Sequence, residues 1–515
     1  MKRFFIIITF IFTSLALHTE QWQILGTRPM GMGGAYVAMA KGPIAQYWNP
    51  AGLAQKSTQT FSGLEIPCGV GIEATGGILD NVTKITEVAK QIENIRNSEI
   101  LTNQDLGPQE VSAFMKSLAL LEDINKKDSG ALVEIAGGVN LKLSKLAFSI
   151  NNFTSVGLNP WIDTLNIGIV NTTVGENIPS ASTQTPTTPV LAEAAGNLTQ
   201  AINIVGFDNI KKIVCGTSDC LSSKGITDAN SLANTLVNSA TTTISQELIL
   251  EASKEALKYA EGSAAVIQNY AANGGNFSAN TSRLDVVAAS FNEAAIGYAK
   301  YLSFLPGLAI GGNIKIIQGN ITSKRFYILE EEKTRDVFKD VLENKKTSVR
   351  PAVDIGLLWD VNERFKKIPF SPKLGFTIRN INSPKFDASY GDKYQLDRQI
   401  RMGLALSPFS WWHFAADIDI TKNKTAVDGF KSRQLSVGTE INILNRKSFN
   451  LPLRLGFLKN LAEDSSKTIY TAGIGLTFAY LHIDLAAGIS SGKQNIDNHK
   501  YPEKAQAVAS VGLLF

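Results

Sequence analysis

The most regular feature of the chain, from about Ser348 to its end, is an alternation of apolar and polar positions. In the segment 412–421 the apolar positions are Trp412, Phe414, Ala416, Ile418 and Ile420, and the positions between them are His413, Ala415, Asp417, Asp419 and Thr421. The same period of two recurs near residues 308, 353, 435, 481 and 505. Side chains point alternately to the two faces of a β-strand, so this pattern predicts strands with one apolar and one polar face.

A soluble antiparallel sandwich would alternate as well, and three further features favour a membrane barrel. The segments run about 9–13 residues, close to the ~9–11 residues that cross a bilayer at a tilt. The apolar face persists from strand to strand, whereas the opposite face carries charges and glycines rather than a second core. Tight turns alternate with longer polar loops, as they do in bacterial outer-membrane barrels.

Counting back from the C-terminus gives sixteen candidate strands. They begin near or span 504, 480, 468, 451, 431, 411, 397, 370, 348, 306, 283–303, 162–170, 144–153, 131–142, 67–76 and 58–66. If the pair at 58–76 belongs elsewhere, the count is fourteen. The predicted fold class is therefore all-β, a transmembrane antiparallel β-barrel of 14–16 strands that occupies residues 58–515.

Two stretches interrupt the alternation and are predicted to be helical insertions, at about 80–127 and 171–282. In the first, apolar residues recur at helical spacing from Val82 to Ile95. The second opens with a Ser/Thr/Pro-rich run and becomes helical from about 227 to 272. By strand parity, the second insertion is expected outside the cell and the first on the periplasmic side.

The N-terminus predicts export. Lys2 and Arg3 precede an apolar run from Phe4 to Phe12, and small residues follow at Ser14 and Ala16. This order is typical of a secretory signal peptide, here residues 1–16. The apolar run is shorter than the ~20 residues of a spanning helix, although a retained helical anchor stays as the alternative. The mature protein is then expected in the outer membrane, in contact with its lipid.

Composition narrows the function classes. Of the 515 residues, 19% are charged and 44% hydrophobic, which is too polar for a bundle of membrane helices. A net charge of +4 gives no reason to expect a nucleic-acid partner. Among the three cysteines, Cys215 and Cys220 could close a small disulfide loop in an exported protein. The sequence offers no convincing metal site, and we expect no metal and no cofactor.

A glycine-rich motif lies near the N-terminus. Residues 26–40 read G-T-R-P-M-G-M-G-G-A-Y-V-A-M-A, with Gly31, Gly33 and Gly34 at their centre. Glycines suit a chain that turns tightly or approaches other backbone closely. The motif leads to Asn49-Pro50-Ala51, and the residue before a proline is pushed out of the helical region. A nucleotide-binding loop is excluded, because Tyr36 stands where the last glycine of such a loop would be.

The pattern R-x-M-G-M-G-G-A-Y-V-A from Arg28, followed by Y-W-N-P-A-G-L-A from Tyr47, resembles the FadL-like superfamily of outer-membrane long-chain fatty-acid transporters. Within that superfamily it looks most similar to the TraF-like (conjugal transfer protein) and PorV-type branches. The segments 451–460 and 471–476, and the terminal aromatic Phe515, are also similar to such barrels.

This resemblance implies a barrel of about fourteen strands whose N-terminal residues, here 17–57, fold into the lumen as a hatch. Asn49, Pro50 and Ala51 match the hatch segment of the family, in which hydrophobic substrates leave through a gap in the barrel wall. A simple structural turn is the alternative for these three residues.

Three functions are compatible with these features. The first is passive transport of small hydrophobic molecules, with lumen charges that set selectivity. These are Asp417, Asp419, Asp484, Arg401 and Glu440, with Lys315, Asp354 and Arg454. The alternative for each charge is that it only pairs with another or meets water. The second function is a structural or assembly role in a secretion or transfer apparatus, which the large insertions favour.

An enzyme is the third function, and we expect none. His413 and His482 could face the lumen, and Gly488-Ile-Ser490-Ser-Gly492 matches a nucleophile motif. The match runs from a strand into a polar loop and lacks the strand–turn–helix context of a nucleophile elbow. No catalytic residue is therefore proposed.

Overall fold

The computed structural model describes residues 21–55, 62–78, 107–126, 128–166, 178–181, 186–216, 219–275, 279–327, 344–366, 368–389, 393–446, 449–496 and 499–514. The predicted signal peptide, the helix expected from Val82 to Ile95 and the terminal Phe515 lie outside the described residues.

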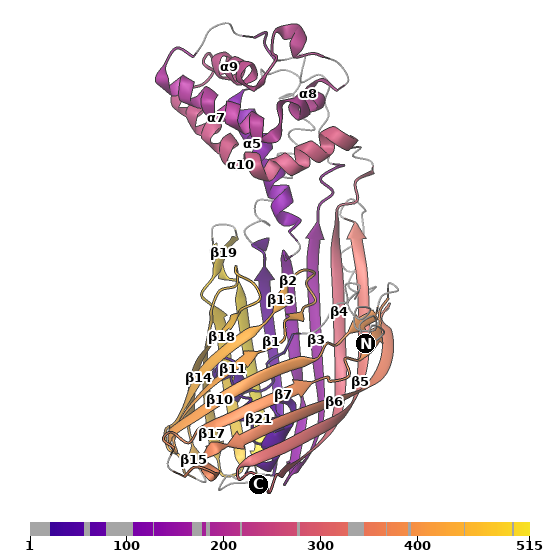
Figure 1. Ribbon diagram of the computed structural model, residues 1–515, viewed down its shortest axis with the longest axis vertical. Helices are drawn as coiled ribbons and strands as arrows, with labels where there is room; N and C mark the ends of the chain where they lie inside the picture. The colour runs from indigo at the N-terminus through magenta and orange to yellow at the C-terminus, as the bar shows by residue number, and fades with distance from the viewer. Residues whose placement is uncertain are drawn as a thin grey trace, which may run out of the picture.

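Fourteen strands of the described part of the chain form one closed antiparallel barrel (Figure 1). They are β1 (Gly63–Thr75), β2 (Gly130–Leu143), β3 (Leu146–Trp161), β4 (Arg283–Tyr301), β5 (Leu308–Tyr327), β6 (Lys346–Asp360), β7 (Lys373–Arg379), β10 (Gln399–Phe409), β11 (Trp412–Asp419), β14 (Gln434–Asn442), β16 (Pro452–Asn460), β17 (Ile469–Phe478), β18 (Leu481–Ser490) and β21 (Lys504–Leu514). Each strand pairs with the next one along this order, and β21 closes the barrel on β1. The predicted fold class is confirmed, at the lower strand count.

The count of fourteen arises differently from the prediction. Residues 63–75 form one strand rather than parts of two, because apolar and polar positions alternate through it without a turn. The strand expected at 162–170 is also wrong in its described part, since residues 162–166 form a turn after β3. Because one strand stands where two were predicted, an odd rather than an even number of strands precedes the first insertion. The chain therefore enters this insertion at the other end of the barrel from the one predicted.

Both insertions consequently leave the barrel at the same end. Thr75 pairs with Gly130 across the first insertion, and Ala131 pairs with Leu158, close to where β3 runs into the second. The expectation that the first insertion lies on the opposite, periplasmic side is wrong for this reason. We call this end the domain end, and the end with the C-terminus and the tight turns between β2 and β3, β4 and β5, β10 and β11, and β17 and β18 the turn end (Figure 1).

The two faces of the wall differ sharply in chemistry. Outward Ile314 is 73% exposed and Leu485 57%, whereas inward Lys315 is 2% exposed and Asp484 8%. Large apolar side chains on the outside and polar ones in the lumen are the arrangement of a membrane-spanning barrel. Helices of the described chain are all too short or too polar to cross a membrane.

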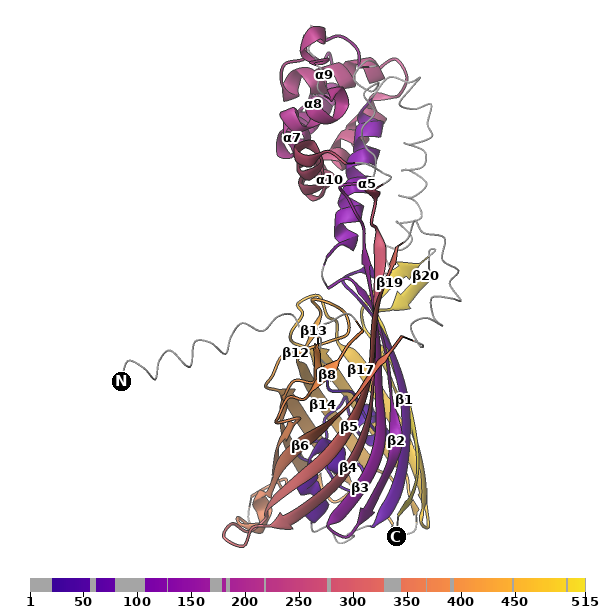
Figure 2. The same cartoon turned by 90° about the vertical axis from the view of Figure 1, so that its right-hand side faces the viewer.

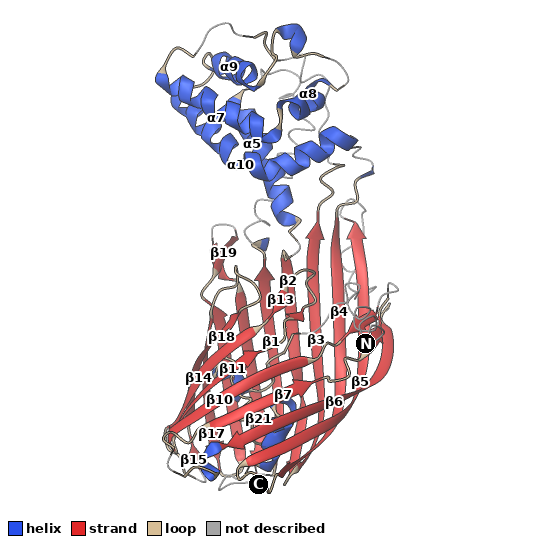
Figure 3. Ribbon diagram, viewed as in Figure 1, coloured by secondary structure: helices blue, strands red, loops and turns tan. Residues whose placement is uncertain are grey.

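The insertions combine into one helical domain beyond the domain end (Figure 3). It comprises α5 (Pro108–Ile124), α7 (Pro189–Val205), α8 (Phe207–Cys215), η2 (Ser222–Lys224), α9 (Ala229–Ala240) and α10 (Gln246–Asn273). Leu118 of α5, Leu198 of α7 and Leu236 of α9 share one buried apolar core. Helix α9 begins with an N-cap of the residue type that helices favour there. The Asp228 side chain accepts a hydrogen bond from the Ser231 N–H (2.7 Å).

Short strand pairs lie in the loops of the domain end. They are β8 (Lys385–Asp387) with β9 (Lys393–Gln395), β12 (Asn423–Lys424) with β13 (Lys431–Ser432), and β19 (Lys493–Ile496) with β20 (His499–Pro502). At the turn end, η4 (Val361–Glu363) follows β6, and β15 (Phe449–Asn450) extends the sheet beside β17.

Candidate functional site

Residues 21–55, which we call the hatch, lie inside the barrel toward the turn end (Figure 2). They form α1 (Thr27–Gly31), α2 (Ala45–Trp48) and the 3-10 helix η1 (Pro50–Ala54). Trp22 is 1% exposed and Trp48 is 0% exposed. No residue of this segment pairs in the barrel sheet. The hatch is therefore a separate folded body within the lumen.

The motif glycines bring the hatch backbone onto the wall. Gly33 has φ +68°, and a Cβ added there would lie 2.4 Å from the carbonyl oxygen of Phe457 in β16. A Cβ on Gly31 would lie 2.9 Å from Cβ of Arg454. Gly34 has φ +89°, a conformation that other residues rarely adopt. Each of the three glycines is thus required by its surroundings.

Glycines of the wall complete the fit from the other side. A Cβ on Gly438 of β14 would meet the carbonyl oxygen of Met32 at 2.4 Å, and one on Gly375 of β7 would meet that of Val37 at 2.6 Å. The alternation in the sequence places glycines on the inward faces, but it does not connect them with the hatch. The signal was present, since a glycine at an inward strand position marks a close approach of another backbone.

Asn49-Pro50-Ala51 sits at a bend between α2 and η1, against β5 and β6. The Asn49 amide donates to the carbonyl oxygens of Val37 (3.0 Å) and of Leu357 in β6 (2.9 Å), and its side-chain oxygen accepts from the Ala51 N–H (3.1 Å). Pro50 begins η1, where its missing N–H leaves no donor unpaired. The asparagine therefore connects two parts of the hatch with the wall.

Asp417 of β11 anchors the middle of the hatch. One of its carboxylate oxygens accepts hydrogen bonds from the backbone N–H groups of Tyr36 (2.7 Å) and Val37 (2.8 Å). Asp417 is 2% exposed. Both backbone N–H groups thus have their acceptor on β11, so Asp417 connects this part of the hatch to the wall.

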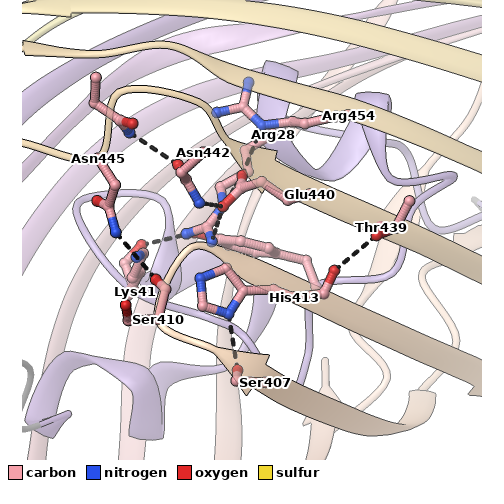
Figure 4. Close-up of polar contacts among 12 residues, drawn as sticks. Arg28, Lys41, Ser407, Ser410, His413, Thr439, Glu440, Asn442, Asn445 and Arg454 are labelled. Atoms are coloured by element: carbon pink, nitrogen blue, oxygen red, sulfur yellow. Dashed lines mark hydrogen bonds and ion pairs between the residues drawn. The ribbon is translucent and has the colours of Figure 1, made fainter.

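A chain of charges joins α1 to three wall strands, and Figure 4 shows its members Arg28, Glu440 and Arg454. Glu440 of β14 receives two hydrogen bonds from Arg28 of the hatch (2.7 Å each) and one from Arg454 of β16 (2.8 Å). Arg454 also pairs with Asp484 of β18 (2.6 Å). The side chains of Glu440 and Arg454 are 3% and 6% exposed. Three predicted lumen charges, Glu440, Arg454 and Asp484, thus meet in one network, whose hatch member, Arg28, we did not predict.

Two further arginines surround the first aromatic residue of the hatch. Arg401 pairs with Asp419 (2.6 Å) and lies 4.5 Å from the ring centre of Trp22. Arg379 lies 4.0 Å from the ring centre of Tyr47 and 5.4 Å from that of Trp22. Guanidinium groups over aromatic faces are attracted to them, most strongly where water is excluded. These contacts hold the N-terminal part of the hatch in the centre of the lumen.

Two other predicted lumen charges, Lys315 and Asp354, also pair with opposite charges. Lys315 lies 3.1 Å from Asp354 and 3.3 Å from Glu293, and Glu293 also pairs with Arg379 (3.2 Å). Arg379 and Glu293 were not among our predicted residues. Which charges meet in the lumen depends on the register between strands, and the sequence of a single strand does not give that register. The lumen at this level is filled by paired charges rather than by a water-filled channel.

Beyond the hatch, toward the domain end, the inner faces of β4 and β5 carry an apolar patch, whereas Glu73 and Lys504 form a buried ion pair on the inner faces of β1 and β21. Phe291 of β4 and Ile317 of β5 point inward and pack with residues of the β8–β9 loop. Phe386 of that loop lies 5.2 Å from Phe291, measured between ring centres, and is fully buried. A second loop places Val427 against Leu132 of β2. Two loops therefore fold into this mouth of the barrel and present apolar side chains there.

The histidines do not form a catalytic arrangement in the described residues. His413 Nδ1 lies 2.8 Å from the Ser407 hydroxyl, and neither ring nitrogen meets a carboxylate within the described chain. Nδ1 of His482 has no hydrogen-bond partner there. Ser490 ends β18 and accepts a hydrogen bond from the Gly492 N–H (3.1 Å), and the next described element is β19 rather than a helix.

Cysteines and metal-ligating residues lie apart from the hatch. Cys215 and Cys220 form a disulfide at the end of α8, in the helical domain. Cys68 is a free thiol on the outward face of β1. Within the described residues, no three His, Cys, Asp or Glu side chains are grouped so that they could hold a metal ion.

Comparisons with known proteins give a family match and several similar solved structures. A family model described as F plasmid transfer operon, TraF, protein matches residues 46–419. No curated protein matches the chain. The Pseudomonas putida toluene transporter TodX is 11% identical and has a TM-score of 0.39, with 97% of this chain and 98% of that chain covered.

Two other solved structures are similar at the same level. The Ralstonia pickettii toluene transporter TbuX is 11% identical, with a TM-score of 0.40 and coverage of 95% of this chain and 98% of that chain. A Pseudomonas aeruginosa FadL homologue is 9% identical, with a TM-score of 0.38 and coverage of 97% and 99%.

Proposed function

The chain belongs to the family of the F plasmid transfer operon TraF protein, and from this premise we propose that it is an outer-membrane barrel for passive transport of small, mostly hydrophobic molecules. The single observation that carries the proposal is that the hatch fills the lumen without joining the sheet. The barrel ladder closes independently of it, so the hatch can shift without breaking the wall.

The apolar patch at the domain end supports a hydrophobic cargo. A simple water-filled pore has a polar interior, whereas here Phe291, Ile317 and Phe386 form a buried apolar cluster above the hatch. A hydrophobic molecule that enters from the outer mouth would reach these side chains once the β8–β9 loop moves aside. The charged network below them would then have to be displaced for the molecule to pass.

The hatch needs a driving force to move. Removing one partner of a buried ion pair costs roughly 3–5 kcal/mol, and Arg28 would leave Glu440 on opening. A ligand shifts such an equilibrium only by its differential affinity for the open state. Cargo that binds between the apolar patch and Trp22 would supply this difference.

Uptake into proteoliposomes tests the proposal. We expect saturable uptake of a small aromatic hydrocarbon and exclusion of a sugar of similar size. Phe386→Ala removes an apolar contact above the hatch and should change the uptake of the hydrocarbon at least several-fold. Phe304→Ala, at an exposed turn-end position (77% exposed), is the matched control and should leave uptake unchanged. Equal uptake with and without the protein would refute the transport function.

The helical domain favours a second candidate, a structural or assembly role similar to that of PorV-type barrels. This domain has its own apolar core and projects beyond the barrel, and a simple pore does not require it (Figure 3). Co-purification of specific surface or periplasmic proteins with the intact chain, and their loss when residues 163–281 are replaced by a short linker, would support this role.

The proposed location rests on the barrel together with the N-terminal sequence. We propose that residues 1–16 are removed on export and that the mature chain resides in the outer membrane. Cell fractionation with N-terminal sequencing tests this, and recovery of the chain from the soluble periplasm would contradict it.

A further inference from the structure

The outer wall of the barrel contains a hollow that the transport proposal does not use. It has a volume of about 860 Å³ and extends over β16, β17, β18, β21, β1 and β2. Outward residues of these strands line it, among them Leu455, Ala472 and Ala487. The hollow therefore opens away from the lumen, on the face that carries the apolar belt.

Strand register explains why the wall is hollowed here. Ala472 of β17 pairs with Ala487 of β18, which in turn pairs with Ala507 of β21. In the neighbouring row, Ala509 of β21 pairs with Cys68 of β1. Each of these outward positions projects only a methyl or thiol group. Larger side chains stand beyond them, such as Leu455, which is 62% exposed, so the small residues form the floor of a depression.

The inner side of the same wall is equally thin. Gly473 of β17 faces Gly31 of the hatch, and a Cβ added to Gly473 would lie 3.1 Å from Cα of Gly31. Helix α1 therefore lies directly behind the hollow. Because neither Gly473 nor Gly31 has a side chain, the backbones of β17 and α1 lie next to each other here.

We propose that this hollow binds a hydrocarbon chain of a membrane lipid. The hollow is continuous with the apolar belt, where outward Ile483 and Ile489 are 46% and 55% exposed, and hydrocarbon is the solvent that this belt meets. Water does not fill an apolar depression, because a water molecule needs about two to four polar partners. An unfilled hollow would forfeit the dispersion contacts of its lining, so a bound chain is retained longer than lipid around the rest of the barrel.

Photo-crosslinking of the full chain in proteoliposomes tests the site. The probe is a phosphatidylcholine with a diazirine in the middle of one acyl chain, and adducts are mapped by mass spectrometry. We expect several-fold more adducts on the strands around Ala487 and Ala507 than around Ile296 and Ile314 on the opposite wall, which are 56% and 73% exposed. Equal labelling of the two walls would overturn the proposal.

Two variants separate the site from a general effect on the barrel. The double substitution Ala487→Phe/Ala507→Phe fills the hollow and should abolish the enrichment. Ala294→Phe, at an exposed outward position of β4, is the matched control and should retain it. Heat-modifiability on a gel shows whether each variant folds. Enrichment that persists in the folded double variant would contradict the assignment.

Competition identifies the occupant and does not depend on the variants. Excess unlabelled phosphatidylcholine should remove the enrichment in the unmodified protein. Displacement by a free alkane but not by the phospholipid would overturn the assignment to lipid. Because neither measurement involves flux or the hatch, the lipid site and the transport function can fail independently.

Discussion

At the scale of single residues, two hatch glycines with similar positive φ angles differ in their surroundings. Gly33 has φ +68° and Gly42 has φ +73°, but a Cβ would contact the wall backbone only at Gly33 and meets nothing within 4 Å at Gly42. An L-residue with positive φ costs roughly 1–2 kcal/mol at either position. At Gly33 the added methyl group must also displace the hatch from β16.

We therefore expect Gly33→Ala to loosen the hatch and Gly42→Ala to leave it seated. Limited proteolysis and single-channel recording of the two folded variants measure this difference. Cleavage within the hatch and current fluctuations should increase in Gly33→Ala only. The same behaviour in both variants would mean that backbone strain, rather than contact with the wall, determines how the hatch is held.

Asp417 offers a test of the polar anchors. Asp417→Ala leaves the buried N–H groups of Tyr36 and Val37 without their acceptor, at a cost of about 1–3 kcal/mol each. Glu73→Ala removes another buried lumen carboxylate, which pairs with Lys504. We expect higher ion leakage through planar bilayers for Asp417→Ala and closed behaviour for Glu73→Ala. Leakage of equal size in both would show that Asp417 does not hold the hatch.

The sequence predicted some of the charges that face the lumen but not which of them meet. Alternation alone placed Asp417, Glu440 and Asp484 on the inward face. Their partners depend on strand tilt and register, which one strand does not encode. Arg28 lies far from Glu440 in the sequence and in a segment without alternation, so no local pattern could connect them.

At the scale of strands, the face assignment leads to a direct prediction. Ile483→Arg places a charge on the lipid-facing side of β18, where it costs roughly 2–4 kcal/mol near the middle of the bilayer. Gln506→Arg on β21 is the matched control, because Gln506 is a half-buried polar residue on the lumen face. Folding yield into vesicles should fall for Ile483→Arg only. Equal yields would contradict the lipid-facing assignment of β18.

The connection between the barrel and the helical domain should be sensitive to acid. Burial tends to raise the pKa of Asp163, but hydrogen bonds from Asn166 and Thr281 outweigh it and hold the pKa below its usual value. The carboxylate accepts from the Thr281 N–H and hydroxyl (3.0 Å each), so it joins the segment after β3 to the segment before β4.

A carboxyl whose pKa is lower in the folded state stabilises the fold above its unfolded pKa, near 3.9. This contribution is lost as the pH falls through the folded pKa. Hydrogen exchange at residues 279–282 should therefore accelerate as the solution is acidified below about pH 4, relative to the intrinsic rate. In Asp163→Asn this additional acceleration should be absent. An identical acid response in the two proteins would exclude Asp163 as its cause.

Elements with a strong period were predicted well, and their connections were not. The faces of β11, β14 and β18 agree with the alternation. Residues 58–76 were predicted as two strands with a break before residue 67, yet Pro67 lies within β1. That one error reversed the expected side of the first insertion, because the side on which an insertion lies depends on the number of strands before it.

At the scale of the whole molecule, the barrel, the helical domain and the hatch are stabilised in different ways. The barrel has its closed ladder, the helical domain has its own apolar core, and the hatch depends on the wall around it. The helical domain could not be assembled from the sequence, because α5 and α7 to α10 come from two insertions that meet only in space. The hatch was expected only through its family resemblance.

Single-channel conductance of a hatch deletion tests the central claim most directly. The deletion removes residues 26–53, keeps the signal peptide, and is compared with the intact protein in planar bilayers after heat-modifiability has shown that both barrels fold. With the hatch absent, the paired charges of the wall would face an open lumen. We predict large, steady conductance for the deletion and near-closed behaviour for the intact chain. Equal conductance of the two folded proteins would contradict the account, because the hatch would then not be what closes the lumen.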